Sequence, residues 1–377
     1  MIEDSEELIA HMSHAIHLAK KAWGQTGTNP MVGAVIVDKG QVVSEGYHQR
    51  SGSKHAEIIA LESYEGTPKE ETTLFVTLEP CSTEGRTGAC TAAIIASGIK
   101  RVVIGTLDPN PLHSGGGITL LESAGITVKV GVLEKECREM NMIFNHWIVH
   151  KSPLCALKLA MTLDGCMAAS TGHSKWVTGE IARNDVMHWR RLFPAIAVSQ
   201  NTVSADNPKL TSRLEDQVFC SRRFVFNREL RDLDKYKKYH LFTDDFKSAT
   251  TVVYGDKASR ADVQALEASG IDSWKISESE GKLDIREFLK LCSEKEIPGI
   301  YIEPGPKLAT HFITNRWADY LFIYQSPKLL MDQKGYSLGD DRFSQFMDES
   351  THLMDVKRDQ FGEDALIRGY LKQQIKS

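Results

Sequence analysis

His55-Ala56-Glu57 and Thr77-Leu78-Glu79-Pro80-Cys81, followed by a second thiol at Cys90, decide how the first part of this 377-residue chain is interpreted. One imidazole and two thiolates supply three ligands for a tetrahedral zinc ion and leave the fourth position open for water. Glu57 lies two residues after the histidine, where its carboxylate can carry protons to and from that water. H-x-E followed by P-C-x-x-C is typical of zinc-dependent hydrolytic deaminases, but here eight residues separate the two thiols.

The predicted local structure places these residues where zinc chemistry is favourable. A helix is expected over 55–63, a strand over 73–78 and a helix over 90–97. His55 and Cys90 would then begin helices, and the partial positive charge of a helix N-terminus favours thiolate over thiol. The alternatives are a structural zinc ion or unrelated thiols. A structural zinc ion requires a fourth protein ligand, and none is obvious nearby, so the pattern favours a catalytic ion.

The bulk composition indicates a soluble protein of two domains. Hydrophobic residues make up 41% of the chain and charged residues 25%, and the length exceeds that of one ordinary core. A net charge of −5 argues against a nucleic-acid-binding surface. Seven cysteines form no regular disulfide pattern, which indicates a reducing compartment. We see neither a signal peptide nor an apolar run of membrane-spanning length, so a cytoplasmic location is expected.

The alternation of elements predicts an α/β fold with a boundary near residue 150, giving domains 1–150 and 151–377. In the first domain, a helix over 5–23 carries His11, His14 and His17, which are interpreted as a solvated or partly packed helix face. Strands are expected over 31–37, 41–46, 101–105 and 126–132, and a helix over 133–149. Ser114-Gly115-Gly116-Gly117 is interpreted as a flexible turn.

The second domain contains no copy of the zinc motif, which indicates a fusion of unlike domains. Strands are expected over 154–160, 195–199, 222–226, 251–254, 299–302 and 318–324, and helices over 179–192, 261–269, 285–295 and 306–315. Residues 229–248 are highly charged and are interpreted as a surface connection.

Further motifs of the first domain identify a family. They are Asn29-Pro30-Met31-Val32-Gly33-Ala34, Gly46-Tyr47-His48, Gly85-Arg86-Thr87 and Asp108-Pro109-Asn110-Pro111. With the zinc motif and its C-x8-C spacing, they closely resemble the deaminase half of the bifunctional riboflavin biosynthesis family RibD, also called RibG. The resemblance implies a cytidine-deaminase-like three-layer α/β/α domain. It also implies Zn²⁺ bound by His55, Cys81 and Cys90, Glu57 as catalytic proton shuttle, and substrate contacts from Asn29, His48 and Arg86.

Five motifs follow in order in the second domain. They are Lys158-Leu159-Ala160-Met161-Thr162-Leu163-Asp164-Gly165, Ser174-Lys175-Trp176-Val177-Thr178, the segment from Thr202 to Arg213, Glu303-Pro304-Gly305-Pro306 and Ser326-Pro327-Lys328-Leu329-Leu330. The residue pattern alone indicates only an α/β domain, but these motifs resemble the reductase half of the same family, a dihydrofolate-reductase-like α/β fold. The resemblance implies NADPH contacts from Ala160, Trp176, Thr202, Asp206 and Gly305. It implies substrate contacts from Ser174, Arg190, Leu210, Arg213 and Glu303. Lys158 is expected at the substrate, where it and Asp206 are candidates for polarising or protonating the opening sugar.

The chain departs from the family pattern at four places. Thr83 stands where the family usually has histidine, and Gly88-Ala89 replaces Pro-Pro before Cys90. Ser199-Gln200-Asn201 replaces a glycine-rich Gly-x-Gly, and Val225-Phe226-Asn227-Arg228 replaces an Ile-Asp-Ser-like strand end. The Ser199-Gln200-Asn201 departure puts side chains where backbone normally approaches the cofactor, and the departure at 225–228 removes an expected cofactor contact. Both predict weaker or altered NADPH binding.

Together these features predict a bifunctional enzyme of riboflavin biosynthesis. The expected reactions are zinc-dependent deamination of 2,5-diamino-6-(5-phosphoribosylamino)pyrimidin-4-one, then NADPH-dependent reduction of the ribosyl group to ribityl. A small-molecule substrate, a homo-oligomer and no nucleic-acid or membrane partner are expected. Three alternatives stay open at this point: an active deaminase with a degenerate, non-catalytic reductase-like domain, a nucleic-acid or nucleoside deaminase, and a non-enzymatic zinc protein.

Overall fold

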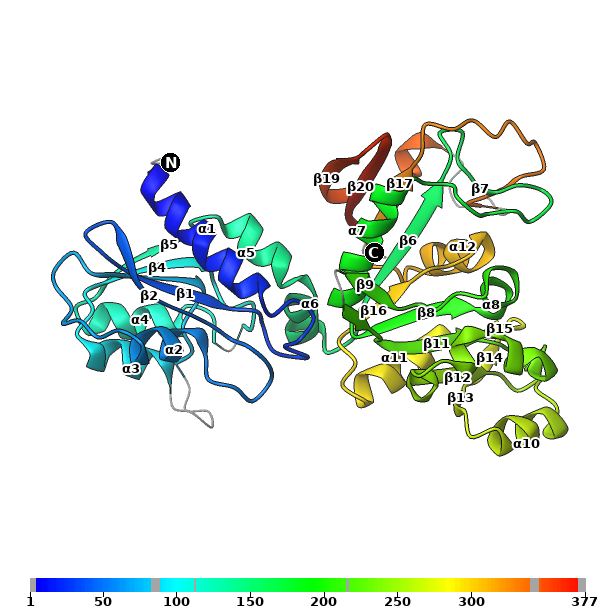
Figure 1. Cartoon of the computed structure of the whole chain (residues 1–377), viewed down its shortest axis with the longest axis horizontal. Coiled ribbons are helices and arrows are strands. Elements are labelled where there is room, and N and C mark those ends of the chain that lie inside the picture. Colours follow the sequence, from blue (N-terminus) through cyan, green and yellow to red (C-terminus); the bar gives the residue numbers. More distant parts are fainter. Residues whose placement is uncertain (1–4, 83–88, 112, 215–216, 340–345, 372–377) are drawn as a thin grey trace. The chain divides into compact units, whose positions relative to one another are not determined.

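The computed structural model describes residues 5–82, 89–111, 113–214, 217–339 and 346–371 (Figure 1). The chain divides into two compact units, Met1–Lys151 and Ser152–Ser377. The first is drawn in blue and cyan in Figure 1 and the second in green to red. Each unit has its own sheet, and each is described by itself below.

The first unit is built around a five-stranded sheet with the order β2-β1-β3-β4-β5. Its strands are β1 (Gly33–Asp38), β2 (Gln41–Tyr47), β3 (Thr73–Leu78), β4 (Arg101–Thr106) and β5 (Thr127–Val130). β1 and β2 form an antiparallel hairpin, and Lys39 and Gly40 turn it with φ values of 51° and 75°. β3, β4 and β5 run parallel. The antiparallel hairpin joins the parallel strands where β1 pairs with β3, and together they make one mixed sheet.

Helices cover both faces of this sheet, which gives the predicted three layers (Figure 1). They are α1 (Glu6–Lys20), α2 (Ala56–Glu62), α3 (Cys90–Ser97), α4 (Gly116–Ser123), α5 (Glu134–Met140) and α6 (Met142–His150). α1 and α5 pack on one face and α2, α3 and α4 on the other. The helices approach closely: a Cβ on Gly33 would lie 1.9 Å from the Ala15 carbonyl oxygen, and one on Gly46 would lie 2.5 Å from that of Ala56.

Two expectations for the first unit need correction. Ser114 and Gly115 lie in a turn, as predicted, but Gly116 and Gly117 begin α4. The helix expected over 133–149 is two helices, α5 and α6, which meet at Asn141 with φ −105° and ψ 23°. Asn141 leaves helical geometry at a point where its side chain bonds the backbone of Met31. His11 and His14 are partly exposed and His17 is exposed, as expected for a solvated or partly packed helix face.

The second unit contains a nine-stranded sheet with the order β13-β12-β11-β8-β16-β6-β17-β20-β19. All neighbouring pairs from β13 to β17 are parallel, and β20 and β19 are antiparallel. The strands are β6 (Leu154–Met161), β8 (Ala195–Ser199), β11 (Arg222–Phe226), β12 (Thr250–Tyr254), β13 (Asp272–Lys275), β16 (Gly299–Ile302), β17 (Tyr320–Gln325), β19 (Leu353–Phe361) and β20 (Asp364–Leu371). Three small pairs join β7 (Cys166–Ala168) with β18 (Tyr336–Ser337), β9 (Ser212–Leu214) with β10 (Gln217–Phe219), and β14 (Glu278–Ser279) with β15 (Lys282–Leu283).

The helices of the second unit bury both faces of its sheet. They are α7 (Glu180–Leu192), α8 (Gln200–Asp206), α9 (His240–Thr243), α10 (Arg260–Ala268), α11 (Ile285–Glu294) and α12 (Pro306–Thr314). The largest apolar cluster joins Phe288 of α11 and Phe312 of α12 to alternate residues of the central strands, such as Phe224. On the other face Trp189 of α7 packs against Phe322 of β17, with ring centroids 4.6 Å apart.

The segment 229–248 is more than the predicted surface connection. It contains a short 3-10 helix, Leu233–Lys238, and α9, and it buries Tyr236, Leu241 and Phe242. Asp244 accepts two hydrogen bonds, of 2.7 and 2.9 Å, from the fully buried guanidinium of Arg223. Arg223 also donates to three backbone carbonyls and to Thr250. Despite its many charged residues, this segment is therefore a packed structure, and Arg223 lies buried at its centre.

Candidate functional site

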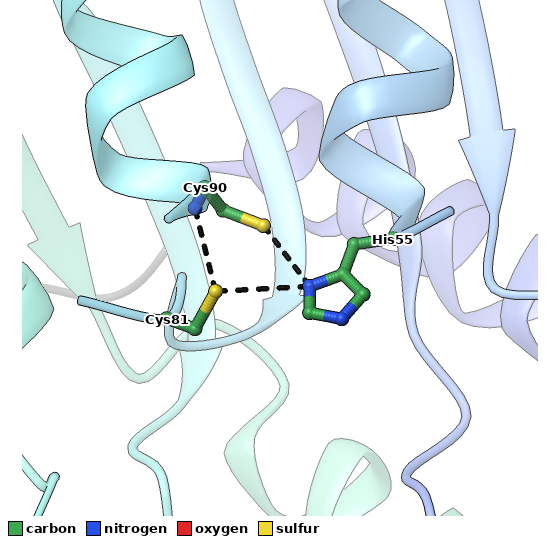
Figure 2. Close-up of side chains that lie close together, drawn as sticks. All are labelled: His55, Cys81 and Cys90. Carbon is green, nitrogen blue, oxygen red and sulfur yellow. Dashed lines mark hydrogen bonds between the residues drawn. The ribbon is translucent and has the colours of Figure 1, made fainter. Parts of the chain in front are cut away.

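His55, Cys81 and Cys90 come together from three elements of the first unit (Figure 2). His55 immediately precedes α2, Cys81 follows β3, and Cys90 is the first residue of α3. The His55 Nδ1 atom lies 3.1 Å from the Cys90 sulfur and 3.7 Å from the Cys81 sulfur. All three donor atoms lie within 4.8 Å of one another, and no other histidine, cysteine and carboxylate group of this kind occurs among the described residues. One imidazole nitrogen and two sulfurs fit a zinc ion with one open position.

The two thiols of the cluster differ in pKa. The Cys90 thiol donates to Cys81, and this hydrogen bond, with those from His55 and the Cys90 backbone N–H, lowers the pKa of Cys81 to about 4. The same contact with Cys81, together with burial, raises the pKa of Cys90. Glu57, on the first turn of α2, is 4% exposed, and burial raises the pKa of its carboxyl group. A thiolate is therefore available before any metal binds, and the neighbouring carboxyl group is suited to carry a proton.

Asn29 and His48 lie beside the cluster. The His48 ring stands edge-on to that of His55, with centroids 5.8 Å apart. His48 Nδ1 lies 3.1 Å from the Lys54 carbonyl oxygen, so it carries the proton, and Nε2 accepts from the Asn29 amide at 3.4 Å. Burial lowers the pKa of His48, which favours this neutral form. Arg86, Thr83 and Gly88 lie outside the described residues.

Glu79 ties the segment that leads into Pro80-Cys81 to the start of α4, a role that the sequence did not suggest. Its side chain is 5% exposed and accepts N–H bonds of 3.1, 3.0 and 3.0 Å from Asp108, Gly115 and Gly117. The N–H groups at the start of α4 are thus occupied by a carboxylate of the same chain. A Cβ on Gly117 would lie 2.2 Å from the Pro80 carbonyl oxygen, so glycine is required there.

The second unit contains a cavity of about 700 Å³ at the carboxyl ends of its parallel strands. This is the edge at which open α/β sheets bind ligands. Seven of the predicted positions line it: Lys158, Ala160, Ser174, Thr202, Asp206, Glu303 and Gly305. They come from β6, the loop after β7, α8, the end of β16 and the residue before α12.

Four predicted positions are not among the residues that line the cavity. Trp176 is 65% exposed, with φ 64°, and the Arg183 guanidinium lies 4.3 Å from its ring centroid. Leu210 is 2% exposed with φ 53°. Arg213 donates to the Thr211 hydroxyl at 3.1 Å. Arg190 reaches the site only through Glu303.

Arg190 and Glu303 form a two-bonded ion pair, with Nε–Oε1 at 2.6 Å and Nη2–Oε2 at 2.8 Å. Burial acts to raise the pKa of Glu303, but the charge and hydrogen bonds of Arg190 outweigh it and hold that pKa below its usual value. Burial lowers the pKa of Lys158, which also lines the cavity. One cavity wall thus carries the carboxylate of Glu303, held in place by Arg190, and the Lys158 ammonium group, whose pKa lies below its usual value.

Two family models match the chain. The one described as "Cytidine and deoxycytidylate deaminase zinc-binding region" matches residues 5–106. The one described as "RibD C-terminal domain" matches residues 153–367, which is more than half of the chain. The chain belongs to the RibD family.

Relatives along the whole length agree with this assignment. Riboflavin biosynthesis protein RibD of Aquifex aeolicus is 39% identical over 357 residues, covering 95% of this chain and 96% of that protein. RibD of Bacillus amyloliquefaciens is 38% identical, with 94% of each chain covered. The structure of Acinetobacter baumannii RibD has a TM-score of 0.78 at 31% identity, covering 98% of this chain and 99% of that one.

Family membership settles the general function. The chain is an enzyme of riboflavin biosynthesis with a zinc-binding deaminase domain and a reductase domain, and the predicted fold class is confirmed. The reductase domain implies a nucleotide cofactor, and RibD enzymes act on small pyrimidines. Among the helices of the described ranges, none is both long enough and apolar enough to cross a membrane.

Proposed function

We propose that this chain deaminates 2,5-diamino-6-(5-phosphoribosylamino)pyrimidin-4-one and then reduces the ribosyl group of the product to ribityl with NADPH. The observation that carries the proposal is the presence, in one chain, of the His55–Cys81–Cys90 cluster with buried Glu57 and of the cavity bearing Lys158 and Glu303. A Thermotoga maritima protein of similar structure, at 31% identity and a TM-score of 0.77, is named a diaminohydroxyphosphoribosylaminopyrimidine deaminase/5-amino-6-(5-phosphoribosylamino)uracil reductase.

In the deaminase domain, His55, Cys81 and Cys90 would hold the zinc ion. A bound zinc ion lowers the pKa of water toward neutrality and so supplies the nucleophile. Glu57 accepts the proton of the attacking water and delivers it to the departing amino group, which leaves as ammonia. Neutral His48 and the amide of Asn29 orient the pyrimidine through hydrogen bonds, and Arg86 contacts its phosphate.

In the reductase domain, a bound nicotinamide cofactor would supply the hydride that reduces C1′ of the ring-opened ribosylamine. Lys158, whose pKa burial lowers, donates a proton as the sugar ring opens. Asp206, which lines the same cavity, assists in this step. Glu303, fixed by Arg190, binds a sugar hydroxyl, because a carboxylate with both oxygens fixed in place is a directional acceptor.

The remaining contacts follow from the same assignment. Ala160, Trp176 and Thr202 contact the cofactor, and Gly305 precedes α12, whose first free N–H groups suit a cofactor phosphate. Ser174, Leu210 and Arg213 contact the substrate. We further propose domains at 1–150 and 151–377, a cytoplasmic location, a homo-oligomeric state and no nucleic-acid partner.

Coupled turnover tests the proposal. Ammonia release and NADPH oxidation are followed together with the purified full chain and the diaminopyrimidine substrate. Both signals are expected, with ammonia first. Glu57→Gln should slow ammonia release by about 10²-fold or more. The same variant should still oxidise NADPH when it is given substrate that has already been deaminated. Lys158→Met should release ammonia at the wild-type rate but should not oxidise NADPH.

Two outcomes contradict the proposal. Ammonia release without NADPH oxidation would favour the alternative in which the second domain is not catalytic. Turnover that survives Glu57→Gln would remove that residue from the chemistry.

A further inference from the structure

Strand β17 places a tyrosine against the lysine of the cavity wall. The Lys158 Nζ atom lies over the ring of Tyr324, 5.8 Å from the ring centroid. Tyr324 is fully buried, and its strand pairs with β6, which carries Lys158. The face of an aromatic ring attracts a cation at this distance. Tyr324 is not among the described residues that line the cavity, so it can act on a ligand only through another side chain.

Two side chains of α7 fix the orientation of the Tyr324 ring. The Tyr324 hydroxyl donates a 2.5 Å hydrogen bond to the Asp185 carboxylate, and the same oxygen accepts from the Trp189 indole N–H at 3.1 Å. The Trp189 ring in turn lies between Phe322, at 4.6 Å, and the guanidinium of Arg368, at 5.1 Å. Hydrogen bonds in a low-dielectric interior polarise one another. A phenol that donates to a carboxylate therefore carries more electron density on its ring and attracts a cation more strongly.

The formal charges around Lys158 balance. Four charged groups act on it, two carboxylates and two guanidiniums: Glu303, Asp206, Arg183 and Arg190. Glu303 is already bonded twice to Arg190, so its charge is largely compensated. Burial meanwhile lowers the pKa of Lys158. The charges alone thus give the ammonium form little support, and the face of the Tyr324 ring supplies an attraction that favours it.

The aromatic hydroxyls beside Lys158 do not compete for its proton. Burial raises the pKa of Tyr324 and of its neighbour Tyr301 on β16 far above the ordinary value, so both phenols keep their protons across the pH range of an activity assay. Among the described groups that face Lys158, its own amine is therefore the one that loses a proton on the alkaline side of neutrality.

We infer that Tyr324, oriented by Asp185, is a positioning residue for the reductase, whose ring holds the Lys158 side chain at the cavity wall in its ammonium form. The inference rests on the proposed function, because it takes Lys158 as the proton donor. As the C1′–O4′ bond of the sugar breaks, the sugar oxygen takes a proton from Nζ. A proton from solvent then restores the ammonium group, which the ring again favours over the neutral amine.

The pH profile of NADPH oxidation tests the inference on the full chain, with substrate that has already been deaminated. Activity that needs the ammonium form falls as pH rises through the pKa of Lys158. Tyr324→Leu removes the ring and so lowers this pKa, which should move the alkaline limb about one pH unit toward lower pH. Tyr324→Phe keeps the ring and should move the limb less than half as far. Ammonia release by the first unit should stay unchanged in both variants.

Competitive labelling measures the same pKa without turnover. A trace of acetic anhydride acetylates neutral amines only, so the pH at which Lys158 becomes labelled reports its pKa. Mass spectrometry compares its peptide with that of Lys290, an exposed lysine of α11, in the same sample. Tyr324→Leu should lower the labelling midpoint of Lys158 by about the same one pH unit and leave that of Lys290 in place.

Tyr320→Leu is the matched control. Tyr320 is a buried tyrosine of the same strand, and its ring packs against Phe322 and Tyr370. Its loss should lower the unfolding temperature as the loss of Tyr324 does, yet leave the alkaline limb and the labelling midpoint of Lys158 at their wild-type values. Tyr324→Met, which keeps more of the buried volume, repeats the test if the leucine variant does not fold.

The outcomes separate the inference from the proposed function. A slower Tyr324→Leu enzyme with both midpoints unchanged would show that Tyr324 only supports the fold, and would overturn the inference. A shift in Tyr324→Phe as large as that in Tyr324→Leu would assign the effect to the hydroxyl and overturn the role of the ring. A wild type that oxidises no NADPH, with the labelling shift present, would contradict the proposed function and support the hold of Tyr324 on Lys158.

Discussion

Asn141 holds the backbone of Met31 from both sides. Its Nδ2 donates to the Met31 carbonyl and its Oδ1 accepts from the Met31 N–H, each at 2.8 Å. The two residues are 110 positions apart, and Asn141 is 4% exposed. Met31 follows Asn29 by two residues, so the junction between α5 and α6 sets the position of the loop that reaches His48.

Asn141→Ala should therefore impair substrate binding by the deaminase. Two buried backbone groups lose their partner, at a cost of about 1–3 kcal/mol in unfolding free energy, and Asn29 loses its fixed position. We expect KM for the diaminopyrimidine to rise more than kcat falls, and NADPH oxidation on deaminated substrate to stay unchanged. Asn145→Ala on the same helix, where the amide bonds only the exposed Arg138 carbonyl, is the control. An unchanged KM would show that Met31 is held by other contacts.

Glu79→Gln should lower zinc occupancy. A glutamine has one acceptor oxygen where the carboxylate has two, so one or more of the three N–H groups from Asp108, Gly115 and Gly117 is left unpaired. The adjoining Pro80-Cys81 segment then loses its anchor, and zinc affinity should fall roughly 10- to 100-fold. Metal content after dialysis against a graded chelator measures this. Glu122→Gln, exposed on α4, should behave as wild type.

Removal of zinc should separate the two activities. A chelator strong enough to strip the ion should abolish ammonia release and leave NADPH binding to the second unit intact, and added Zn²⁺ should restore release. Cys90→Ser should reproduce the loss permanently. Cys137→Ser is the matched control, because that thiol is buried but lies outside the cluster. Ammonia release from the zinc-free protein would contradict the assignment.

Arg190→Gln should damage the reductase and spare the deaminase. It leaves the Glu303 carboxylate buried without its cation, which typically costs about 3 kcal/mol or more. Arg190→Lys restores the charge without the two-bonded geometry and should recover only part of the loss. NADPH oxidation and thermal unfolding of both variants measure the effect. Arg286→Gln, at an exposed pair, is the control and should change neither measurement.

Stability should fall on acidification in a window set by His146 of α6. Burial, with the nearby His150 ring, lowers the pKa of His146 to about 4, against about 6.5 in an unfolded chain. The unfolded state therefore binds the proton more readily. The contribution is fully present above pH 6.5 and is lost as pH falls toward 4, by up to about 3 kcal/mol. Unfolding in denaturant across this range should show the slope, and His146→Gln should flatten it. His17→Gln on the exposed face of α1 should leave it unchanged.

The sequence predicted those parts of the fold that local patterning controls. The strand over 73–78 and the helix over 90–97 were predicted to the residue, because a short apolar run marks the strand and Gly98 ends the helix, and both signals are local. The antiparallel strands β19 and β20 were missed. β19 lies at the edge of the sheet, and its charged residues interrupt the alternation of apolar and polar positions that would have predicted a strand: Asp355, Lys357, Arg358 and Asp359.

The candidate site residues divide in the same way into those that local sequence predicted and those that depend on the tertiary fold. The cysteines and His55 were found because their spacing is fixed by the motif. Glu79, Asn141 and the Tyr324–Asp185 contact were not found, because each depends on a partner brought close only by the tertiary fold.

The strand orders of the two sheets have a consequence for synthesis of the chain on the ribosome. In the first unit almost every strand pairs with one close to it in sequence. In the second, Leu154 at the start of β6 pairs with Gly299 of β16, 145 positions later. At translation speeds of about 5–20 residues per second, roughly 7 to 30 s pass before the partner strand of β6 has been made. The deaminase sheet can thus close while the strands of the reductase are still being made, and the exposed β6 edge is the part of the nascent chain most in need of protection by chaperones.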